Sequence, residues 1–222
     1  MPGRTTVLIT GTDKGAGKTW TGCALARALL DAGRTVRAVK AVETGCGEAP
    51  SAEEDGVRLA KATGQAEPQR ALRRFRAPVA PAIAADLEGG SLDLDPLAAE
   101  IDVAAGQADV LLLETAGGLL SPLAWDWSAL DLATALDAAS LVVASDRRGA
   151  INLTLLTLSA LDLAGVRVAG IVLAAPREAD ASTGSNADAI ARLSGIDRVR
   201  TVPRSADPAL AVTWFVEVAA WL

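Results

Sequence analysis

The stretch that decides the fold is Gly11-Thr12-Asp13-Lys14-Gly15-Ala16-Gly17-Lys18-Thr19, which directly follows the apolar run Val7-Leu8-Ile9-Thr10. A strand that ends in a glycine-rich turn closing on Gly-Lys-Thr is typical of a phosphate-binding loop. Its glycines let the backbone curl so that successive N–H groups point at one anion, and the following helix directs its positive end there too. In this pattern Lys18 reaches the β- and γ-phosphates, and the Thr19 hydroxyl holds Mg²⁺. We therefore predict a nucleotide site.

The spacing of this loop is unusual. Five residues separate Gly11 from Gly17, whereas the common pattern has four. The alternative interpretation is a glycine-rich turn with a solvated lysine, but a strand pattern before the loop and a helical pattern after it favour the phosphate site.

Length and composition restrict the class of protein. The 222 residues fit one large α/β domain, so we predict a single domain over residues 1–222. No window approaches twenty uncharged apolar residues, and the start of the chain runs into the first strand without a cleavable apolar segment. Cys23 and Cys46 are the only cysteines, which argues against a disulfide framework and predicts a cytoplasmic location.

Charge and missing residue types exclude several functions. A formal net charge of −6 gives no footprint for nucleic acid, and we interpret the cluster of Arg70, Arg73, Arg74 and Arg76 as a solvated helix face. Histidine and tyrosine are both absent, so Ser–His, Cys–His and zinc–His chemistries are excluded. Phosphoryl transfer tolerates this restriction, because it depends mostly on positioning and charge neutralisation.

Short apolar runs alternate with helical patterns along the chain. Strands are predicted at residues 5–10, 35–39, 110–114, 140–145, 168–174 and 199–202, and helices at 19–32, 55–63, 96–105, 129–136, 151–164, 185–193 and 208–221. Because the strands are apolar throughout, both of their faces are expected to be buried. We predict an α/β P-loop fold with a mostly parallel central sheet, helices on both faces, and ligands at the carboxyl ends of the strands.

Two long connections lie beside these predicted ligand positions. Residues 42–54 are long enough to form a mobile active-site loop, and residues 175–186 follow the fifth strand, where they could border a nucleobase. Plain surface turns remain an equal alternative for the middle of each.

Three charged residues suggest chemistry beside the phosphate loop. Lys40 stands at the carboxyl end of the second strand, a position that points into the ligand crevice. Glu114 emerges from a buried strand and needs a partner, either Mg²⁺ or a salt bridge or helix cap. Asp55 opens a helix, where a cap and a metal ligand are equally good interpretations. Gly117 and Gly118 follow Glu114 and leave backbone N–H groups open to a ligand.

The order and spacing of these motifs resemble the dethiobiotin synthetase family. The resemblance is carried by Gly11-Thr12-Asp13 with Gly17-Lys18-Thr19, Lys40 with Thr44-Gly45, Asp55, Pro78 with Pro81, Glu114 with Ala116-Gly117-Gly118, and Gly149-Ala150-Ile151-Asn152 with Leu155, Thr157, Leu161 and Gly165. The five-residue spacer of the phosphate loop is also a feature of that family. The resemblance covers about residues 5–174 well and the remainder loosely.

The resemblance implies an ATP-dependent cyclo-ligase of biotin biosynthesis. In that family 7,8-diaminononanoate, CO₂ and ATP give the cyclic urea of dethiobiotin. One amine forms a carbamate, the carbamate takes the γ-phosphoryl group to form a mixed anhydride, and the second amine closes the ring. This sequence needs little acid–base equipment, which suits a chain without histidine.

The resemblance also implies roles for individual residues. Lys18, Lys40 and Thr44 would be catalytic, and Thr19, Asp55 and Glu114 would ligate Mg²⁺. The nucleotide would be held by Thr12, Asp13, Lys14, Gly15, Ala16, Gly17, Lys18, Thr19, Glu114, Gly117, Ala174, Pro203 and Arg204. The diamine would be held by Thr44, Gly117 and Gly118, and by Gly149, Ala150, Ile151 and Asn152 of a partner subunit, because the family is typically homodimeric. The stretch Leu119-Leu120-Ser121-Pro122-Leu123 with Trp125 suits either that interface or core packing.

This chain departs from the family at several positions. Lys14 and Gly15 stand where many members carry Thr and Glu, Ala41 replaces a proline, and Ala82 replaces a histidine. Thr115 stands at the second place of a motif commonly read Glu-Gly-Ala-Gly-Gly, and Ala174 replaces an asparagine that reads adenine in many members. These departures leave the base preference and the exact substrate open.

Two other functions remain as alternatives. A partition-type switch ATPase shares the fold, but such proteins usually carry a lysine five places before the lysine of Gly-Lys-Thr, where this chain has Asp13. A paralogous ATP-dependent ligase acting on another substrate is kept open by Ala41, Ala82 and Thr115.

Overall fold

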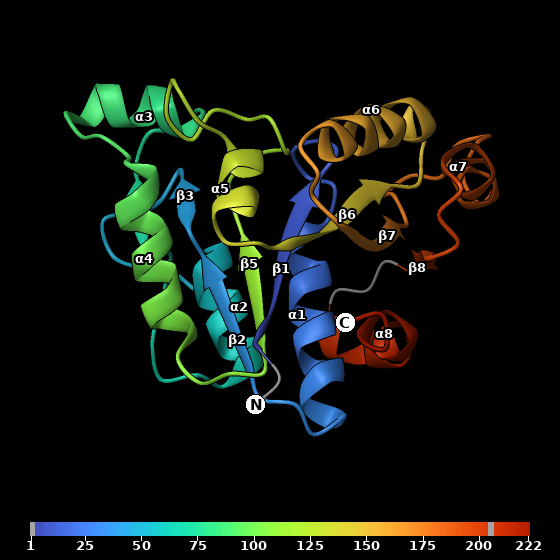
Figure 1. The fold of residues 1–222 in the computed structure, drawn as a ribbon, viewed down its shortest axis with the longest axis horizontal. Coiled ribbons are helices and arrows are strands. Elements are labelled where there is room, and N and C mark those ends of the chain that lie inside the picture. The colour runs from blue at the N-terminus through green and yellow to red at the C-terminus, as the bar shows by residue number, and fades with distance from the viewer. Residues whose placement is uncertain (1–2, 204–206) are drawn as a thin grey trace.

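The computed structural model describes residues 3–203 and 207–222, which form an α/β fold with a central sheet (Figure 1). In chain order the elements are β1 (Thr5–Gly11), α1 (Lys18–Asp31), β2 (Val36–Lys40), β3 (Val42–Thr44), α2 (Asp55–Thr63), β4 (Arg73–Phe75), α3 (Pro81–Glu88), α4 (Leu94–Ala105), β5 (Val110–Glu114), α5 (Ala129–Ala135), β6 (Ala139–Ser145), α6 (Ala150–Leu163), β7 (Val168–Ala174), α7 (Asn186–Ser194), β8 (Val199–Val202), the 3₁₀ turn η1 (Pro208–Ala211) and α8 (Val212–Ala219). The main sheet has the order β2-β5-β1-β6-β7-β8, and each neighbouring pair is parallel. The predicted fold class is confirmed.

Helices cover both faces of this sheet and create two cores. Leu8 of β1 packs into the core shared with α4, α5, α6 and α7. Its neighbours Val7 and Ile9 pack into the opposite core, shared with α1, α2 and α8. Since successive side chains of a strand point to opposite faces, a strand between two helical layers must be apolar at every position.

The strand order places the phosphate loop at the centre of the carboxyl edge. β1 lies between β5 and β6, so the chain leaves β1 toward one side of the sheet and later returns to the other. A crevice forms where the direction of winding reverses in this way, and ligands bind there. In the same edge Glu114 of β5 is the register partner of both Ile9 of β1 and Lys40 of β2.

A small second sheet was not predicted. β3 pairs with β4 in parallel, and Thr44 is the register partner of Phe75. The connection predicted over residues 42–54 therefore begins as a strand. Three-residue strands are too short to show a periodic pattern, which explains why both escaped prediction.

The interpretation of the arginine cluster as a helix face is wrong. Arg73 and Arg74 lie on β4, where Arg74 forms an ion pair with Glu54 at 2.7 Å and Arg73 one with Glu100 at 2.7 Å. Helix α3 was also missed, and its Pro81 occupies the first turn, where proline is well tolerated.

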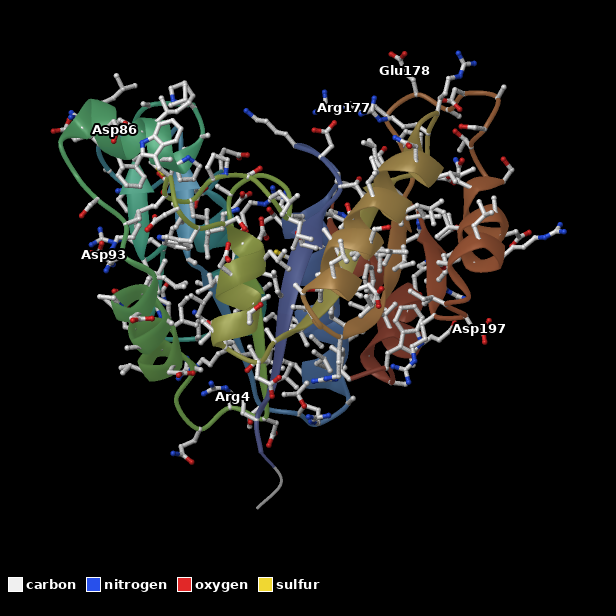
Figure 2. All side chains as sticks on the ribbon, turned by 45° about the horizontal axis from the view of Figure 1, so that its top comes forward. Arg4, Asp86, Asp93, Arg177, Glu178 and Asp197 are labelled. Carbon is white, nitrogen blue, oxygen red and sulfur yellow. The ribbon has the colours of Figure 1, made fainter. Side chains whose placement is uncertain are left out.

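The connection after β7 is joined by hydrogen bonds to the segment that follows β6. The buried Asp146 accepts hydrogen bonds from the Gly184 N–H at 2.9 Å and the Asn186 amide at 2.7 Å. Asp180 accepts one from the Arg148 N–H at 2.8 Å. The charged side chains of Arg177 and Glu178 extend outward at the tip of this connection (Figure 2). Among the described residues, no helix is long and apolar enough to cross a membrane.

Candidate active site

A cleft of about 1370 Å³ runs along the carboxyl ends of the central strands. One part of its wall is polar and comes from the phosphate loop, the end of β2, the start of α2 and the end of β5. The rest is largely apolar and includes residues 78–81, 119–120 and the exposed side of α6. The cleft therefore offers a charged end and an apolar end to the same ligand or pair of ligands.

Backbone conformation shapes the phosphate loop. Gly15 and Gly17 have φ angles of 75° and 103°, values that side-chain-bearing residues adopt only with strain. A Cβ on Gly11 would lie 3.1 Å from the Lys18 Nζ, so this glycine leaves room for the lysine to fold back over the loop. Lys18 is 8% exposed, and its burial lowers the pKa of the ammonium despite nearby Glu114. An anion bound in the loop would supply the missing counter-charge.

The outer part of the loop is joined by an ion pair to the segment between β6 and α6. The Lys14 N–H donates to the Asp13 carboxylate at 2.6 Å, and the same carboxylate lies 3.5 Å from the Arg147 guanidinium. Asp13 and Lys14 are both exposed. Neither side chain covers the bottom of the loop, which is left to Lys18 and the backbone.

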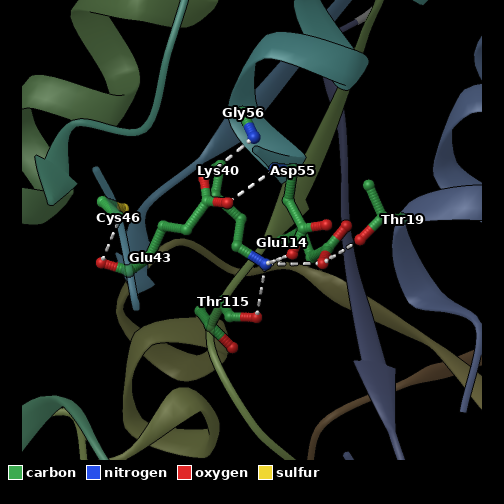
Figure 3. A network of polar contacts seen from close by, with 8 residues as sticks. All are labelled: Thr19, Lys40, Glu43, Cys46, Asp55, Gly56, Glu114 and Thr115. Atoms are coloured by element: carbon green, nitrogen blue, oxygen red, sulfur yellow. Dashed lines mark hydrogen bonds and ion pairs between the residues drawn. The ribbon is translucent and has the colours of Figure 1, made fainter. Parts of the chain in front are cut away.

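Lys40 is the centre of the charged end (Figure 3). Its ammonium donates to Glu114 at 2.6 Å, to Asp55 at 2.7 Å, and more weakly to the Thr115 carbonyl at 3.4 Å. Thr19 donates its hydroxyl hydrogen to the same Glu114 oxygen at 2.9 Å. Helix α1, strands β2 and β5 and helix α2 thus meet at one point, although their residues lie far apart in the sequence.

The charges in this group stabilise one another. Burial alone would lower the pKa of Lys40, but the carboxylates of Glu114 and Asp55 outweigh it and raise that pKa well above its ordinary value. Burial alone would raise the pKa of Asp55, but the charge and hydrogen bond of Lys40 outweigh it and the pKa falls below its ordinary value. Lys40 is therefore a permanent cation and cannot act as a base near neutral pH.

The oxygen atoms of Thr19, Asp55 and Glu114 fit the preferences of Mg²⁺. Among the described residues, the second carboxylate oxygen of Glu114 is buried and has no hydrogen-bond partner. A buried carboxylate oxygen left unpaired is costly, and a hard divalent cation would satisfy it. The two carboxylates and the hydroxyl have the chemistry expected for a Mg²⁺ site, and none of them is histidine or thiolate.

Glu43 was not recognised from the sequence. It lies on β3 and is 8% exposed, and its two carboxylate oxygens accept the N–H groups of Asp55 at 2.6 Å and Gly56 at 3.0 Å. Burial, together with nearby Asp55, raises its pKa. The only sequence feature that could have pointed to it was its position between Lys40 and Thr44.

The structure brings most of the predicted site residues to the cleft. Those that line it are Thr12, Asp13, Lys14, Gly15, Ala16, Gly17, Lys18, Thr19, Lys40, Thr44, Asp55, Glu114, Gly117, Gly118, Ala174 and Pro203. Gly149, Ala150, Ile151 and Asn152 lie at the start of α6 and do not line it in this chain. Arg204 lies outside the described residues.

One of the two glycine positions differs from the sequence interpretation. The Gly118 N–H is not open to a ligand, because it donates to the Ser121 hydroxyl at 2.8 Å. A Cβ on Gly117 would lie 2.2 Å from that hydroxyl oxygen, so the glycine is required by the turn itself. Within the stretch that suited interface or core, Leu119 and Leu123 are buried, whereas Leu120 and Trp125 are exposed.

The apolar end of the cleft was also missed. Leu153, Leu156, Thr157 and Ala160 of α6 face it, and Leu156 is 60% exposed. Val79 lies on the facing wall and is 38% exposed. The available signal was the leucine-rich pattern of the helix, which carries more leucines than one buried face needs.

Comparisons with known proteins agree with this geometry. A family model described as an AAA domain matches residues 5–209. The ATP-dependent dethiobiotin synthetase of Anaeromyxobacter dehalogenans is 39% identical over 204 residues, covering 90% of this chain and 91% of that protein. The enzyme of the same name from Caulobacter is 43% identical over 75% of this chain and 74% of that protein, and the one from Aquifex aeolicus is 36% identical over 90% of both.

Solved structures support the fold. The septum site-determining protein MinD of Pyrococcus horikoshii, solved with Mg-ADP, superposes with a TM-score of 0.58 at 15% identity, covering 97% of this chain and 94% of that one. A ParA family ATPase from Chlorobium tepidum gives a TM-score of 0.58 at 13% identity, covering 98% and 92%. At these identities the likeness concerns the fold alone, whereas the sequence relatives extend over nearly the whole chain. The chain belongs to the ATP-dependent dethiobiotin synthetase family.

Proposed function

We propose that this protein converts 7,8-diaminononanoate, CO₂ and ATP into dethiobiotin, ADP and phosphate, a step of biotin biosynthesis. The observation that carries the proposal is the position of Lys40. It places a permanent buried cation at the end of β2, beside a phosphate loop and at the head of an apolar-walled cleft. A carbamate on a chain of methylene groups has the matching distribution of charge and apolar surface.

The reaction is balanced without a protein base. An amine of the substrate adds to CO₂ and loses a proton to water, giving the carbamate anion. A carbamate oxygen attacks the γ-phosphorus and ADP leaves. The second amine then attacks the carbamoyl carbon of the mixed anhydride and loses a proton to the departing phosphate or to water, phosphate leaves, and the urea ring is closed.

The residues of the charged end suit these steps. Lys18 would contact the β- and γ-phosphates from the loop, and Lys40 would lie on the carbamate side, so that negative charge moves between two fixed cations. Thr44 lies at the end of β3 and lines the cleft, and its hydroxyl would hydrogen-bond the carbamate or the substrate amine. Mg²⁺ held by Thr19, Asp55 and Glu114 would neutralise phosphate charge.

The apolar end suits a second subunit as well as the substrate chain. Gly149, Ala150, Ile151 and Asn152 do not line the cleft of their own chain, so any role in binding the distant carboxylate would be played in a partner's site. The exposed Leu156 and Leu153 lie on the same helix. We propose a homodimer formed through the side of α6 that carries Leu153 and Leu156.

Phosphate release tests the proposed reaction. With Mg²⁺, ATP and bicarbonate, release is expected to require the diamine and to match dethiobiotin one to one. An analogue with the 8-amine replaced by hydrogen keeps an amine that can add to CO₂ but lacks the amine that closes the ring. It should therefore give no cyclic urea. If phosphate appeared at the same rate without any amine, the synthetase assignment would be wrong and a switch ATPase would be favoured.

A further inference from the structure

The least enclosed member of the charged group is Asp55. Its side chain is 34% exposed, whereas Lys40 is 3% and Glu114 is 1% exposed. Packing therefore fixes Lys40 and Glu114, but it does not fix Asp55. Asp55 is the first residue of α2, so its position depends on where that helix begins.

The start of α2 is held from β3. Glu54 is the residue that precedes the helix, and its side chain makes no capping hydrogen bond to the helix. The carboxylate of Glu43 takes that place and accepts the first two N–H groups, at 2.6 Å and 3.0 Å (Figure 3). A carboxylate near a helix N-terminus is favoured both by the hydrogen bonds and by the helix dipole.

The same turn is held from β4. The Arg74 guanidinium donates to both oxygens of Glu54, at 2.7 Å and 2.9 Å, and a further donation goes to the Gly47 carbonyl at 3.0 Å. Arg74 is 15% exposed and Glu54 is 7% exposed, so this is a bidentate pair with little access to water. The paired strands β3 and β4 thus hold two consecutive residues. Glu43 of β3 binds the backbone of Asp55, and Arg74 of β4 binds the side chain of Glu54.

Close packing removes the remaining freedom. A Cβ on Gly56 would lie 2.3 Å from the Ala71 nitrogen and 2.7 Å from the Arg70 carbonyl carbon. The backbone of the first helical turn therefore lies directly against the chain that leads into β4. The helix cannot slide toward that segment, and the two N–H groups held by Glu43 prevent it from moving away.

We propose that Glu43 is a positioning residue of the active site, which acts through the backbone of Asp55 to hold that carboxylate beside Lys40 and the cation site. Arg74 contributes to the same positioning through its ion pair with Glu54. The assignment rests on the proposed function only in giving Asp55 a cation to bind. Because Glu43 is followed directly by Thr44, the same short strand sets both the metal side and the substrate side of the cleft.

A merely structural cap would also stabilise α2, so the test must measure the cation site itself. We would titrate Mn²⁺, as a paramagnetic substitute for Mg²⁺, into the full-length protein saturated with ADP, and follow free Mn²⁺ by electron paramagnetic resonance. Residues that orient metal ligands from outside the coordination shell typically change metal affinity by about 10- to 100-fold. We expect Glu43→Gln, which replaces one accepting oxygen by an N–H₂ donor, to weaken Mn²⁺ binding by about 10-fold or more.

Matched variants separate positioning from charge and from stability. Glu53→Gln removes a charge from the same helix end, but Glu53 is exposed, so Mn²⁺ affinity is expected to stay within about twofold. Arg74→Met removes the ion pair with Glu54 and is expected to weaken Mn²⁺ binding, as Glu43→Gln does. ADP binding in the presence of a chelator should be unchanged in all three, because the phosphate loop is untouched.

Two results would overturn the proposal. One is wild-type Mn²⁺ affinity in a Glu43→Gln protein whose thermal stability has fallen, which would make Glu43 a structural cap only. The other is no ADP-dependent Mn²⁺ binding by the wild type. Failure of the proposed function has a different result, phosphate release without the diamine, and would leave the Mn²⁺ comparison intact.

Discussion

At the scale of single residues, Lys40 combines two roles that are usually separate. Its ammonium neutralises Glu114 inside the protein, and the same ammonium lines the cleft where the carbamate is proposed to bind. Since both neighbouring carboxylates raise its pKa, it keeps its charge throughout the working pH range. A substitution at this position therefore affects stability and catalysis together.

Lys40→Met is expected to lower turnover by about 10²-fold or more, because one of the two cations beside the moving charge is lost. It should also lower the free energy of unfolding by roughly 3–5 kcal/mol, because a buried Glu114 is left without its counter-charge. Steady-state phosphate release and urea unfolding measure the two effects.

The double variant Lys40→Met/Glu114→Gln tests the structural role. It removes the unpaired charge, so it should recover part of the stability, and its turnover should stay low because Glu114 is itself a proposed Mg²⁺ ligand. Recovery of turnover with stability would show that Lys40 acts only by supporting the fold.

At the scale of elements, the contact between α2 and the segment that leads into β4 shows how closely packed backbone limits substitution. Gly56→Ala places a methyl group against the rigid backbone of Ala71. Alanine is ordinarily better than glycine inside a helix by roughly 0.5–1 kcal/mol, so any loss must come from this contact. We expect a net loss of about 1–3 kcal/mol, typical of overpacking, measured by urea unfolding.

Gly170→Ala is the matched comparison for Gly56→Ala. A Cβ there would lie 2.4 Å from the ring of Trp221, one residue from the end of the chain. The Trp221 ring is a side chain that can change its χ angles, and the nearest backbone atom, the Arg198 carbonyl oxygen, is 3.1 Å away, whereas at Gly56 the backbone nitrogen of Ala71 is 2.3 Å away. Equal losses of unfolding free energy in the two variants would contradict this distinction between a side-chain neighbour and a backbone neighbour.

The connection after β7 gives an acid-dependent prediction. Hydrogen bonds from the Arg148 N–H and from Ser182 lower the pKa of Asp180 to about 2. The ordinary value in an unfolded chain is about 3.9, so the stabilisation is complete above that pH and is lost as the pH falls toward 2. Asp180→Asn should therefore be less stable than wild type at pH 6, and this difference should shrink by pH 3.

Urea unfolding at several pH values between 6 and 3 measures this change. Asp197→Asn, at an exposed position before β8, removes the same charge and serves as the control. A constant difference for Asp180→Asn would show that its hydrogen bonds do not favour the ionised form.

The sequence predicted the large elements and missed the small ones, for a physical reason. Strands buried on both faces, such as Val110–Glu114, can be recognised in a sequence by their continuous apolar residues. Lys40 and Glu114 could be assigned to one edge because parallel strands end together, whereas Asp55, which begins a helix, was placed beside them only by the family resemblance. Glu43 could not, because its role depends on β3 and α2 meeting in space, and no local pattern encodes that distance.

At the scale of the whole molecule, the cleft is walled on one side by an exposed leucine-rich helix surface. A second subunit on that surface would enclose the apolar end. Leu156→Asp places a charge there and is expected to convert a dimer, of twice the 22.6 kDa chain mass, into a monomer with a raised KM for the diamine.

Sedimentation velocity and steady-state kinetics measure these two outcomes. Leu193 on α7 is 62% exposed, close to the 60% of Leu156, and does not line the cleft, so Leu193→Asp is the matched control. A wild-type monomer, or a Leu156→Asp dimer with unchanged kinetics, would exclude this surface as the interface.

The pairing of Lys40 with Glu114 across neighbouring strands has a consequence for folding during synthesis. β5 lies between β1 and β2, and the ion pair joins residues 74 positions apart. A nascent chain that ends before β5 carries the complete phosphate loop, but β1 and β2 have no strand between them and Lys40 has no buried partner. Contacts of such long sequence separation form late, because their loop-closure entropy must be overcome first. On the ribosome, nucleotide binding by this protein should therefore begin only after β5 has emerged from the exit tunnel.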